Sequence, residues 1–173
     1  MIRPKTCAQT LLAVCLAACA PAAMALAETA PTARVSPAGP ALLTITGADG
    51  TSASFDAAML AALPQVSFTT TTIWTDGPQT FTGVPMGALL AAAQISGKKL
   101  IAKAANDYSV EIPVEPWPKD APIVAYLRNG KPTSIRDKGP LWIVYPYDSD
   151  PAYRSEVIYT RSIWQLERIA VQP

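Results

Sequence analysis

Short segments with a β-strand pattern, separated by glycine and proline turns, constrain the fold of this chain most. Residues 41–47 alternate apolar and polar side chains, and residues 51–55 follow the Ala48-Asp49-Gly50 turn as their hairpin partner. The segments with a comparable pattern are 65–74, 79–83, 99–105, 109–113, 121–132, 139–146 and 162–171. Strands grouped around a few short helices, without regular alternation of the two, predict the α+β class.

Two short helices are predicted between these strands. Asp56 can cap a helix over residues 57–63, because its carboxylate can accept from the free amides of the first turn, and Pro64 ends it. Pro85 suits the first position of a second helix, over residues 86–94. The polar segment 147–157 is predicted to be an exposed loop.

The start of the chain has the pattern of a secretory signal. Arg3 and Lys5 precede the apolar run 11–27, which is too short and too rich in alanine for a membrane span and ends in a small-residue cleavage pattern. We therefore expect a signal peptide over residues 1–27, a flexible leader rich in proline and alanine over 28–40, and a folded domain over 41–173 in the periplasm or outside the cell. The segment before Cys19 also resembles a bacterial lipobox, so lipidation of Cys19 is the alternative.

The types of residue present exclude several kinds of chemistry. All three cysteines lie within the first 27 residues, and the chain contains no histidine. After cleavage the domain has no thiol and no imidazole, which excludes Cys-His and Ser-His-Asp catalysis and the usual zinc sites. Removal of the signal leaves 12 of the 14 Lys and Arg against 13 Asp and Glu, so nothing attracts nucleic acid.

Four segments, in order, resemble the oxidoreductase molybdopterin-binding domain found in sulfite oxidases and their relatives. They are the segments FTGVPMGALL at 81–90, ANDYSVEIP at 105–113, NGKPTSIRDKGPLWIVYP at 129–146 and WQLERIAV at 164–171. Each motif is weak by itself, but the four together at sensible spacings are specific. The resemblance covers about residues 41–172 and implies an α+β domain with a mixed, barrel-like sheet and a few short helices.

The chain departs from that family where the cofactor would be held. The resemblance implies a cysteine thiolate on molybdenum, a soft ligand suited to that metal, but Ile73 and Trp74 occupy the corresponding place. The family's histidine is absent, with Lys138 nearest to it, its arginine corresponds to Trp142, and its last lysine has no equivalent beside Trp164. Because those cations would hold the pterin phosphate and pyran, we expect no bound cofactor, and molybdopterin is the alternative that the resemblance allows.

The resemblance also implies which polar and aromatic residues surround a cleft at the ends of the strands. Such a lining suits a flat, polar or anionic small molecule through stacking and hydrogen bonds. Arg136 and Lys138 are candidate anion-binding groups, although two solvated charges beside a turn are the simpler interpretation. The predicted ligand-binding residues are Trp74, Asp76, Asn106, Asp107, Tyr108, Arg136, Lys138, Tyr145 and Trp164.

Three functional hypotheses follow. The first is an exported small-ligand-binding or accessory module with the molybdopterin-domain fold but no thiolate-bound molybdenum. The second is a molybdopterin-dependent oxidoreductase that holds its cofactor through the pterin alone, with Asp107 or Tyr108 in proton transfer. The third is an extracytoplasmic interaction partner of a membrane sensor. No catalytic or metal-binding residue is predicted.

Overall fold

The computed structural model describes residues 37–118 and 121–173, which belong to the unit Ala33–Pro173. The predicted signal peptide, Cys19 and the leader as far as residue 36 lie outside the described residues. At the end of the leader, the backbone N–H of Gly39 donates to Asp56 Oδ2 at 2.9 Å, which fastens this residue to the folded domain. None of the helices in the described part is both long and apolar enough to cross a membrane.

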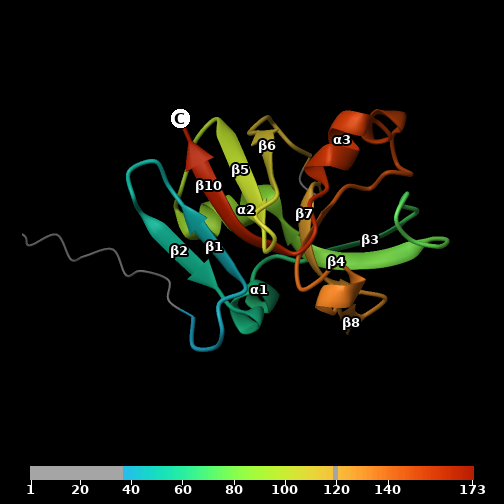
Figure 1. Cartoon of the computed structure of the whole chain (residues 1–173), viewed down its shortest axis with the longest axis horizontal. Coiled ribbons are helices and arrows are strands. Elements are labelled where there is room, and N and C mark those ends of the chain that lie inside the picture. The colour runs from blue at the N-terminus through green and yellow to red at the C-terminus, as the bar shows by residue number, and fades with distance from the viewer. Residues whose placement is uncertain (1–36, 119–120) are drawn as a thin grey trace, which may run out of the picture. The chain divides into compact units, whose positions relative to one another are not determined.

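The first sheet has five strands in the order β2-β1-β10-β5-β6 (Figure 1). β1 pairs in parallel with β10, and the other neighbours are antiparallel. Beyond the last β5–β10 pair, Leu166 with Ala104, the N–H of Ala105 donates to the carbonyl of Gln165 at 2.9 Å. The strands are β1 (Leu43–Thr46), β2 (Ser52–Phe55), β5 (Lys99–Ala104), β6 (Ser109–Pro113) and β10 (Leu166–Gln172). This register brings the turn after β5 beside the residues that precede β10.

The second sheet is antiparallel and has the order β3-β4-β7-β8, with β9 also paired to β7. An isolated bridge joins Trp142 of β9 to Trp164, and the N–H of Leu166 donates to the carbonyl of Leu141 at 3.0 Å. The strands are β3 (Val66–Thr70), β4 (Gln79–Pro85), β7 (Ile123–Arg128), β8 (Lys131–Pro132) and β9 (Trp142–Val144). The segment before β10 therefore connects the two sheets.

Three α-helices and two 3-10 turns complete the described fold: α1 (Ala57–Ala62), α2 (Met86–Ala93), η1 (Ile135–Asp137), η2 (Pro151–Tyr153) and α3 (Glu156–Arg161). Asp56 caps α1 as predicted, since its Oδ1 accepts from the N–H of Met59 at 2.8 Å. The hydrogen bonds that Asp56 accepts from the backbone N–H groups of Met59 and, to a smaller extent, Gly39 lower its pKa. Pro85 was predicted to be the first residue of the second helix. In the structure it is the last residue of β4 and the N-cap of α2.

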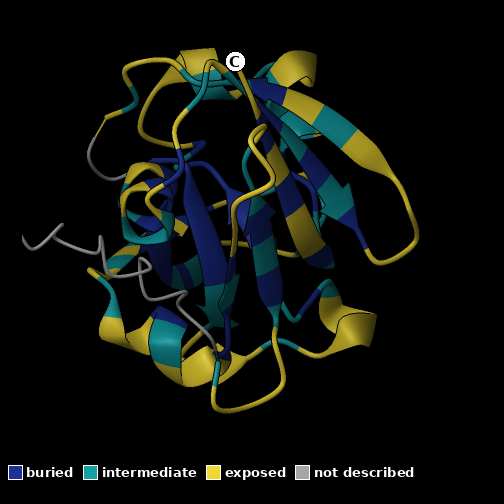
Figure 2. Cartoon of the chain, turned by 90° about the vertical axis from the view of Figure 1, so that its left-hand side faces the viewer, coloured by how far each residue is buried: buried dark blue, intermediate teal, exposed yellow. Residues whose placement is uncertain are grey.

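The core lies between the sheets and beneath the helices, and Figure 2 shows buried residues along the strands with exposed residues in the connecting loops. Two predicted elements were wrong. The strand predicted over 65–74 ends at Thr70, and Ile73 and Trp74 lie in a turn beyond it. The loop predicted over 147–157 contains η2 and the start of α3, whose cap is Ser155.

Candidate functional site

An aromatic pocket of about 440 Å³ lies where the β5–β6 turn, α3 and the segment before β10 meet. Its size falls within the range of small-molecule sites. It is lined by Trp74, Ala104, Asn106, Tyr108, Tyr159, Thr160, Ser162, Ile163 and Trp164. Two indole and two phenol rings thus line it, and amide and hydroxyl groups supply its polar part.

Trp74 is half-buried and contacts four other aromatic rings edge to face. Its ring centroid lies 5.6 Å from that of Trp164 and 5.7 Å from that of Tyr159. The same centroid lies 5.8 Å from that of Trp142 and 6.3 Å from that of Tyr147. Edge-to-face contacts place the positive ring edge on the negative face of the neighbour, so this cluster holds the indole in a fixed orientation.

The turn that carries Trp74 is held by hydrogen bonds to the loop after β9. Asp148 accepts from the backbone N–H of Thr71 at 2.6 Å through Oδ2 and from its hydroxyl at 2.7 Å through Oδ1. The N–H of Asp148 donates in return to Thr70 Oγ1 at 3.1 Å, and Thr72 Oγ1 accepts from the N–H of Trp74 at 3.1 Å. The hydrogen bonds from Thr71 lower the pKa of Asp148, so this carboxylate is ionised when it fastens the turn.

The α3 side of the pocket is positioned by a buried hydroxyl pair. Tyr147 donates through its phenol to Ser162 Oγ at 2.6 Å, and Ser162 donates to the carbonyl of Ile158 at 2.7 Å. The indole Nε1 of buried Trp142 donates to the carbonyl of Ser162 at 3.1 Å. Burial raises the pKa of Tyr147 far above its usual range, so the phenol stays a neutral donor. Ser162 is therefore fixed at the wall of the pocket.

The β5–β6 turn supplies the opposite wall. Tyr108 is 51% exposed, and its N–H donates to Asn106 Oδ1 at 3.2 Å. Asp107 adopts a left-handed φ of 66° and lies outside the lining, where its carboxylate contacts Lys103 at 2.8 Å and Arg168 at 3.5 Å. The hydrogen bond and charge of Lys103, and then the charge of Arg168, lower the pKa of Asp107. Its negative charge is thus already matched by two cations.

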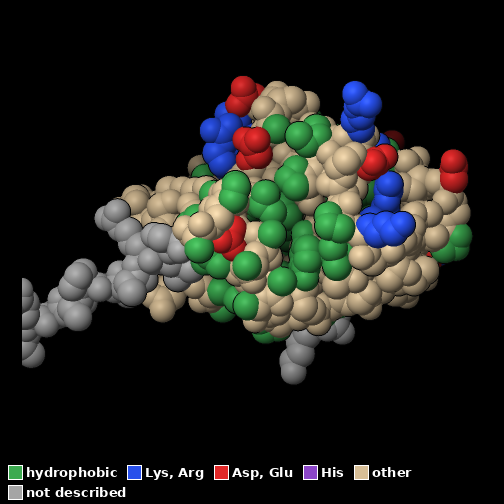
Figure 3. Space-filling view, turned by 90° about the horizontal axis from the view of Figure 1, so that it is seen from below, with side chains coloured by type: hydrophobic (Ala, Val, Ile, Leu, Met, Phe, Trp, Pro, Cys, Tyr) green, Lys and Arg blue, Asp and Glu red, His purple; other side chains and the backbone are tan. Residues whose placement is uncertain are grey.

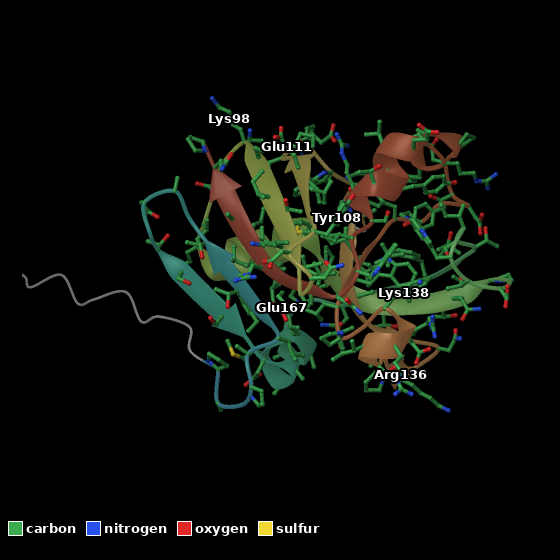
Figure 4. All side chains as sticks on the ribbon, viewed as in Figure 1. Lys98, Tyr108, Glu111, Arg136, Lys138 and Glu167 are labelled. Atoms are coloured by element: carbon green, nitrogen blue, oxygen red, sulfur yellow. The ribbon has the colours of Figure 1, made fainter. Side chains whose placement is uncertain are left out.

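Lys138 lies beside the pocket without lining it. Its Nζ is 4.8 Å from the ring centroid of Trp164, which is a cation–π contact. Its carbonyl accepts from the N–H of Gln165 at 3.2 Å, so the backbone of η1 is tied to the segment before β10. Arg136 is exposed on η1, and Figure 4 places it at the lower margin of the molecule, well away from Tyr108.

The structure therefore brings together only part of the predicted site. Trp74, Asn106, Tyr108 and Trp164 line the pocket, while Asp107 and Lys138 lie next to lining residues. Asp76 is exposed in the β3–β4 turn, and Tyr145 is buried against Tyr147 and Tyr153. Arg136, Asp76 and Tyr145 do not belong to the pocket lining.

Sequence reasoning missed Tyr159, Thr160 and Ser162, which lie in or just after α3. Two sequence signals could have found the helix: Ser155 caps its first turn by accepting from the N–H of Ile158 at 3.4 Å, and Glu156 follows the cap. The helix has only six residues, and the sequence shortly before it is polar and contains Asp150 and Pro151, which are typical of a loop.

The donor groups of this pocket do not fit a thiolate-bound molybdenum. Its lining offers indole, phenol, hydroxyl and amide groups, whereas the metal calls for a soft sulfur ligand. Among the described residues, no Lys or Arg lines the pocket to hold a pterin phosphate. Lys138 contacts the Trp164 ring beside the pocket, and Arg136 lies at the lower margin of the molecule. Within residues 37–118 and 121–173, no cluster of Asp, Glu, Cys or His is suited to bind a metal ion.

A larger groove of about 730 Å³ lies beside α2, and its lining includes Pro64, Leu90, Ile95, Glu115 and Trp117. Its side chains are mostly small or aliphatic, with Trp117 as the one aromatic ring among the described lining residues, so it offers fewer polar and aromatic groups to select a ligand. Figure 3, which views the molecule from below, shows hydrophobic side chains gathered in the middle of that face, with Lys and Arg side chains toward its edges. We therefore place the candidate site in the smaller, aromatic pocket.

Comparisons with known proteins identify the fold. No protein-family model matches the chain, and no curated protein matches it. Among solved structures, the sulfane dehydrogenase SoxCD from Paracoccus pantotrophus is similar, with a TM-score of 0.57 and 21% identity. The likeness covers 75% of this chain and 37% of that one, so the chain spans well under half of the neighbour's length. It confirms the predicted class, an α+β domain with the sulfite oxidase-like oxidoreductase fold.

Proposed function

We propose that this domain is an exported binding or accessory module that holds a small organic molecule in the aromatic pocket and carries no thiolate-bound molybdenum. The observation that carries the proposal is the position of Trp74. The family resemblance puts a metal-binding thiolate at this place in the sequence, and here an indole packed against Trp164 and Tyr159 lines the pocket instead.

The chemistry of the lining supports recognition by stacking and hydrogen bonds. The exposed Tyr108 and the half-buried Tyr159 and Trp164 offer aromatic surface, and Asn106 and Thr160 offer polar groups. Within the described residues, the phenolic hydroxyls of Tyr108 and Tyr159 have no hydrogen-bond partner in the protein. A bound molecule with polar atoms can satisfy them.

The oxidoreductase alternative has less support from this site. Its suggested proton-transfer groups, Asp107 and Tyr108, are adjacent in sequence, but Asp107 is bound to Lys103 and Arg168 outside the pocket lining. A carboxylate matched in this way is a poor proton acceptor, because its two cations favour the ionised form. We therefore propose binding, and no step of oxidation or reduction.

A screen of small molecules by NMR tests the proposal, because the indole N–H signals of Trp74 and Trp164 report on the pocket. Compounds that bind should shift these two signals and leave that of Trp117, which lies in the other groove, unchanged. The substitution Tyr108→Leu removes an exposed ring from the pocket and should weaken binding at least about tenfold. If no compound class shifts the two pocket indoles, the proposed function is wrong.

A further inference from the structure

Trp74 meets two of the other three aromatic side chains of the pocket at steep angles. The Trp74 ring makes interplanar angles of 69° with Trp164 and 85° with Tyr159. Tyr108 reaches the same pocket from the β5–β6 turn, so two indoles and two phenols surround one space. Because each ring face carries negative electrostatic potential, several faces around one space attract a cation.

Among the described residues, no charged side chain lines the pocket, and this favours an organic cation over an anion. No Lys or Arg is present among its lining residues to pair with an anion. The carboxylate of Asp107, which stands in sequence between the lining residues Asn106 and Tyr108, is bound to Lys103 and Arg168, so it does not call for a hydrogen-bonding ammonium ligand. A cation recognised here must be stabilised by ring faces, which suits a methylated ammonium group that has no N–H to donate.

One indole of this pocket already binds an ammonium group. The Nζ of Lys138 lies 4.8 Å from the ring centroid of Trp164, although Lys138 itself is not part of the lining. This contact shows that the Trp164 ring is placed to interact with a cation in the folded domain.

Polar groups at the edge of the pocket can bind the rest of such a ligand. Asn106, Thr160 and Ser162 supply amide and hydroxyl groups, and the volume of about 440 Å³ exceeds the space that a trimethylammonium head needs. We propose that the aromatic pocket is a cage for the trimethylammonium group of a small quaternary ammonium compound, with its polar tail directed to these side chains. This inference deepens the proposed function and rests on it.

Three probes of similar shape test the charge preference. Choline carries the trimethylammonium cation, 3,3-dimethylbutan-1-ol is its neutral carbon analogue, and 3,3-dimethylbutanoate is an anion of similar bulk. Titration followed by the NMR signals of the Trp74 and Trp164 indoles should show choline binding at least about tenfold more tightly than the neutral analogue. The anion should bind most weakly. Equal affinity of choline and its neutral analogue would overturn the cage.

Two variants of the exposed Tyr108 distinguish the contribution of its ring to choline binding from that of its hydroxyl. Tyr108→Phe keeps the ring and should keep choline affinity within about twofold, whereas Tyr108→Leu should lose about tenfold. Tyr126→Leu is the matched control, because Tyr126 lies on β7 outside the pocket and should bind choline as the wild type does. Loss of choline binding in Tyr108→Phe, or none in Tyr108→Leu, would contradict the inference.

Lys138→Gln tests independently whether the pocket prefers a positively or a negatively charged ligand. It removes a positive charge beside the pocket while leaving the lining unchanged, so choline affinity should stay the same or rise. A site for an anion would instead lose affinity. A fall in choline affinity with a folded protein would therefore argue against recognition of a cation.

The trimethylammonium group occurs both in free solutes and in a lipid headgroup. Choline and glycine betaine test the free form, and vesicles of phosphatidylcholine, compared with vesicles of phosphatidylglycerol, test the lipid. Binding in either arm supports the cage and identifies its source, and binding in neither overturns it. If uncharged planar compounds shift the pocket indoles while every quaternary ammonium probe fails, the cage is wrong but the proposed binding function stands. If nothing shifts them, both are wrong.

Discussion

The rings of Trp74 and Trp164 meet edge to face, with 5.6 Å between their centroids. Trp74 reaches this position from a turn after β3, and Trp164 from the segment before β10. The contact therefore joins parts of the chain that are far apart in sequence, and both residues line the same pocket. An aromatic pair of this kind fixes the shape of a site as well as its chemistry.

Trp74→Ala should destabilise the domain markedly, because four aromatic contacts are lost at once. We expect a loss of about 3 kcal/mol in the free energy of unfolding, near the lower end for truncation of a large aromatic residue. Urea denaturation measures it. Trp117→Ala is the control, since Trp117 is also half-buried but has no aromatic pair among the described residues, and it should cost clearly less. An equal loss of unfolding free energy in the two variants would show that the aromatic contacts of Trp74 add nothing to stability.

Asp148→Asn should lower the thermal midpoint at neutral pH, because the ionised carboxylate accepts two hydrogen bonds from Thr71. The pKa of Asp148 is lowered in the folded state from 3.8, so its stabilisation is complete well above that value and is lost as the pH falls through the lowered pKa. The difference between wild type and variant should therefore shrink as the pH is taken below 3.8. Asp76→Asn, an exposed carboxylate in the neighbouring turn, should leave the midpoint nearly unchanged. A difference that persists undiminished in acid would refute this role.

Tyr147→Phe should cost about 1 kcal/mol of unfolding free energy, because it removes a buried hydrogen bond of 2.6 Å to Ser162. Tyr159→Phe is the paired control, since the Tyr159 hydroxyl has no protein partner within the described residues, and it should cost little. Chemical denaturation of both variants at one pH compares them. A larger loss of unfolding free energy in Tyr159→Phe than in Tyr147→Phe would mean that the Tyr147 hydroxyl does not hold Ser162 in place.

Gly83→Ala should destabilise the second sheet, because a Cβ at this position would run into the backbone of Val124 and Ala125. The β4–β7 register shifts between Thr82 and Gly83, and the close approach depends on the missing side chain. Gly87→Ala on α2 is the contrasting change, since nothing lies within 4 Å of the added atom. It should stabilise the protein by about 0.5 to 1 kcal/mol through helix propensity. Thermal unfolding that moves in the same direction for both would contradict this assignment.

The strands could be predicted where local pattern and tertiary burial agree. In β1, Leu43 and Ile45 are buried while their neighbours are less so, and the same alternation in the sequence gave the prediction. The cap at Asp56 was equally readable, because its hydrogen bonds reach only three residues along the chain. Fold class followed from the order of these elements, and the structural likeness to SoxCD confirms it.

The composition of the pocket could be predicted less well, because it depends on contacts across the chain. The carboxylate of Asp148 ends the β3 strand early by holding Thr71, and the two residues are 77 positions apart. The short helix α3 brings in Tyr159, which pattern alone did not place. Tyr145 shares the aromatic character of the site residues, but the pairing of β9 with β7 leaves it buried near Tyr153.

Native mass spectrometry of the protein isolated from its source cells tests the central claim most directly. We expect a one-to-one complex with a small organic molecule that is released on denaturation and is missing from the Tyr108→Leu variant purified in the same way. A stoichiometric adduct with the mass and isotope pattern of a molybdenum-containing group, retained by that variant, would contradict it.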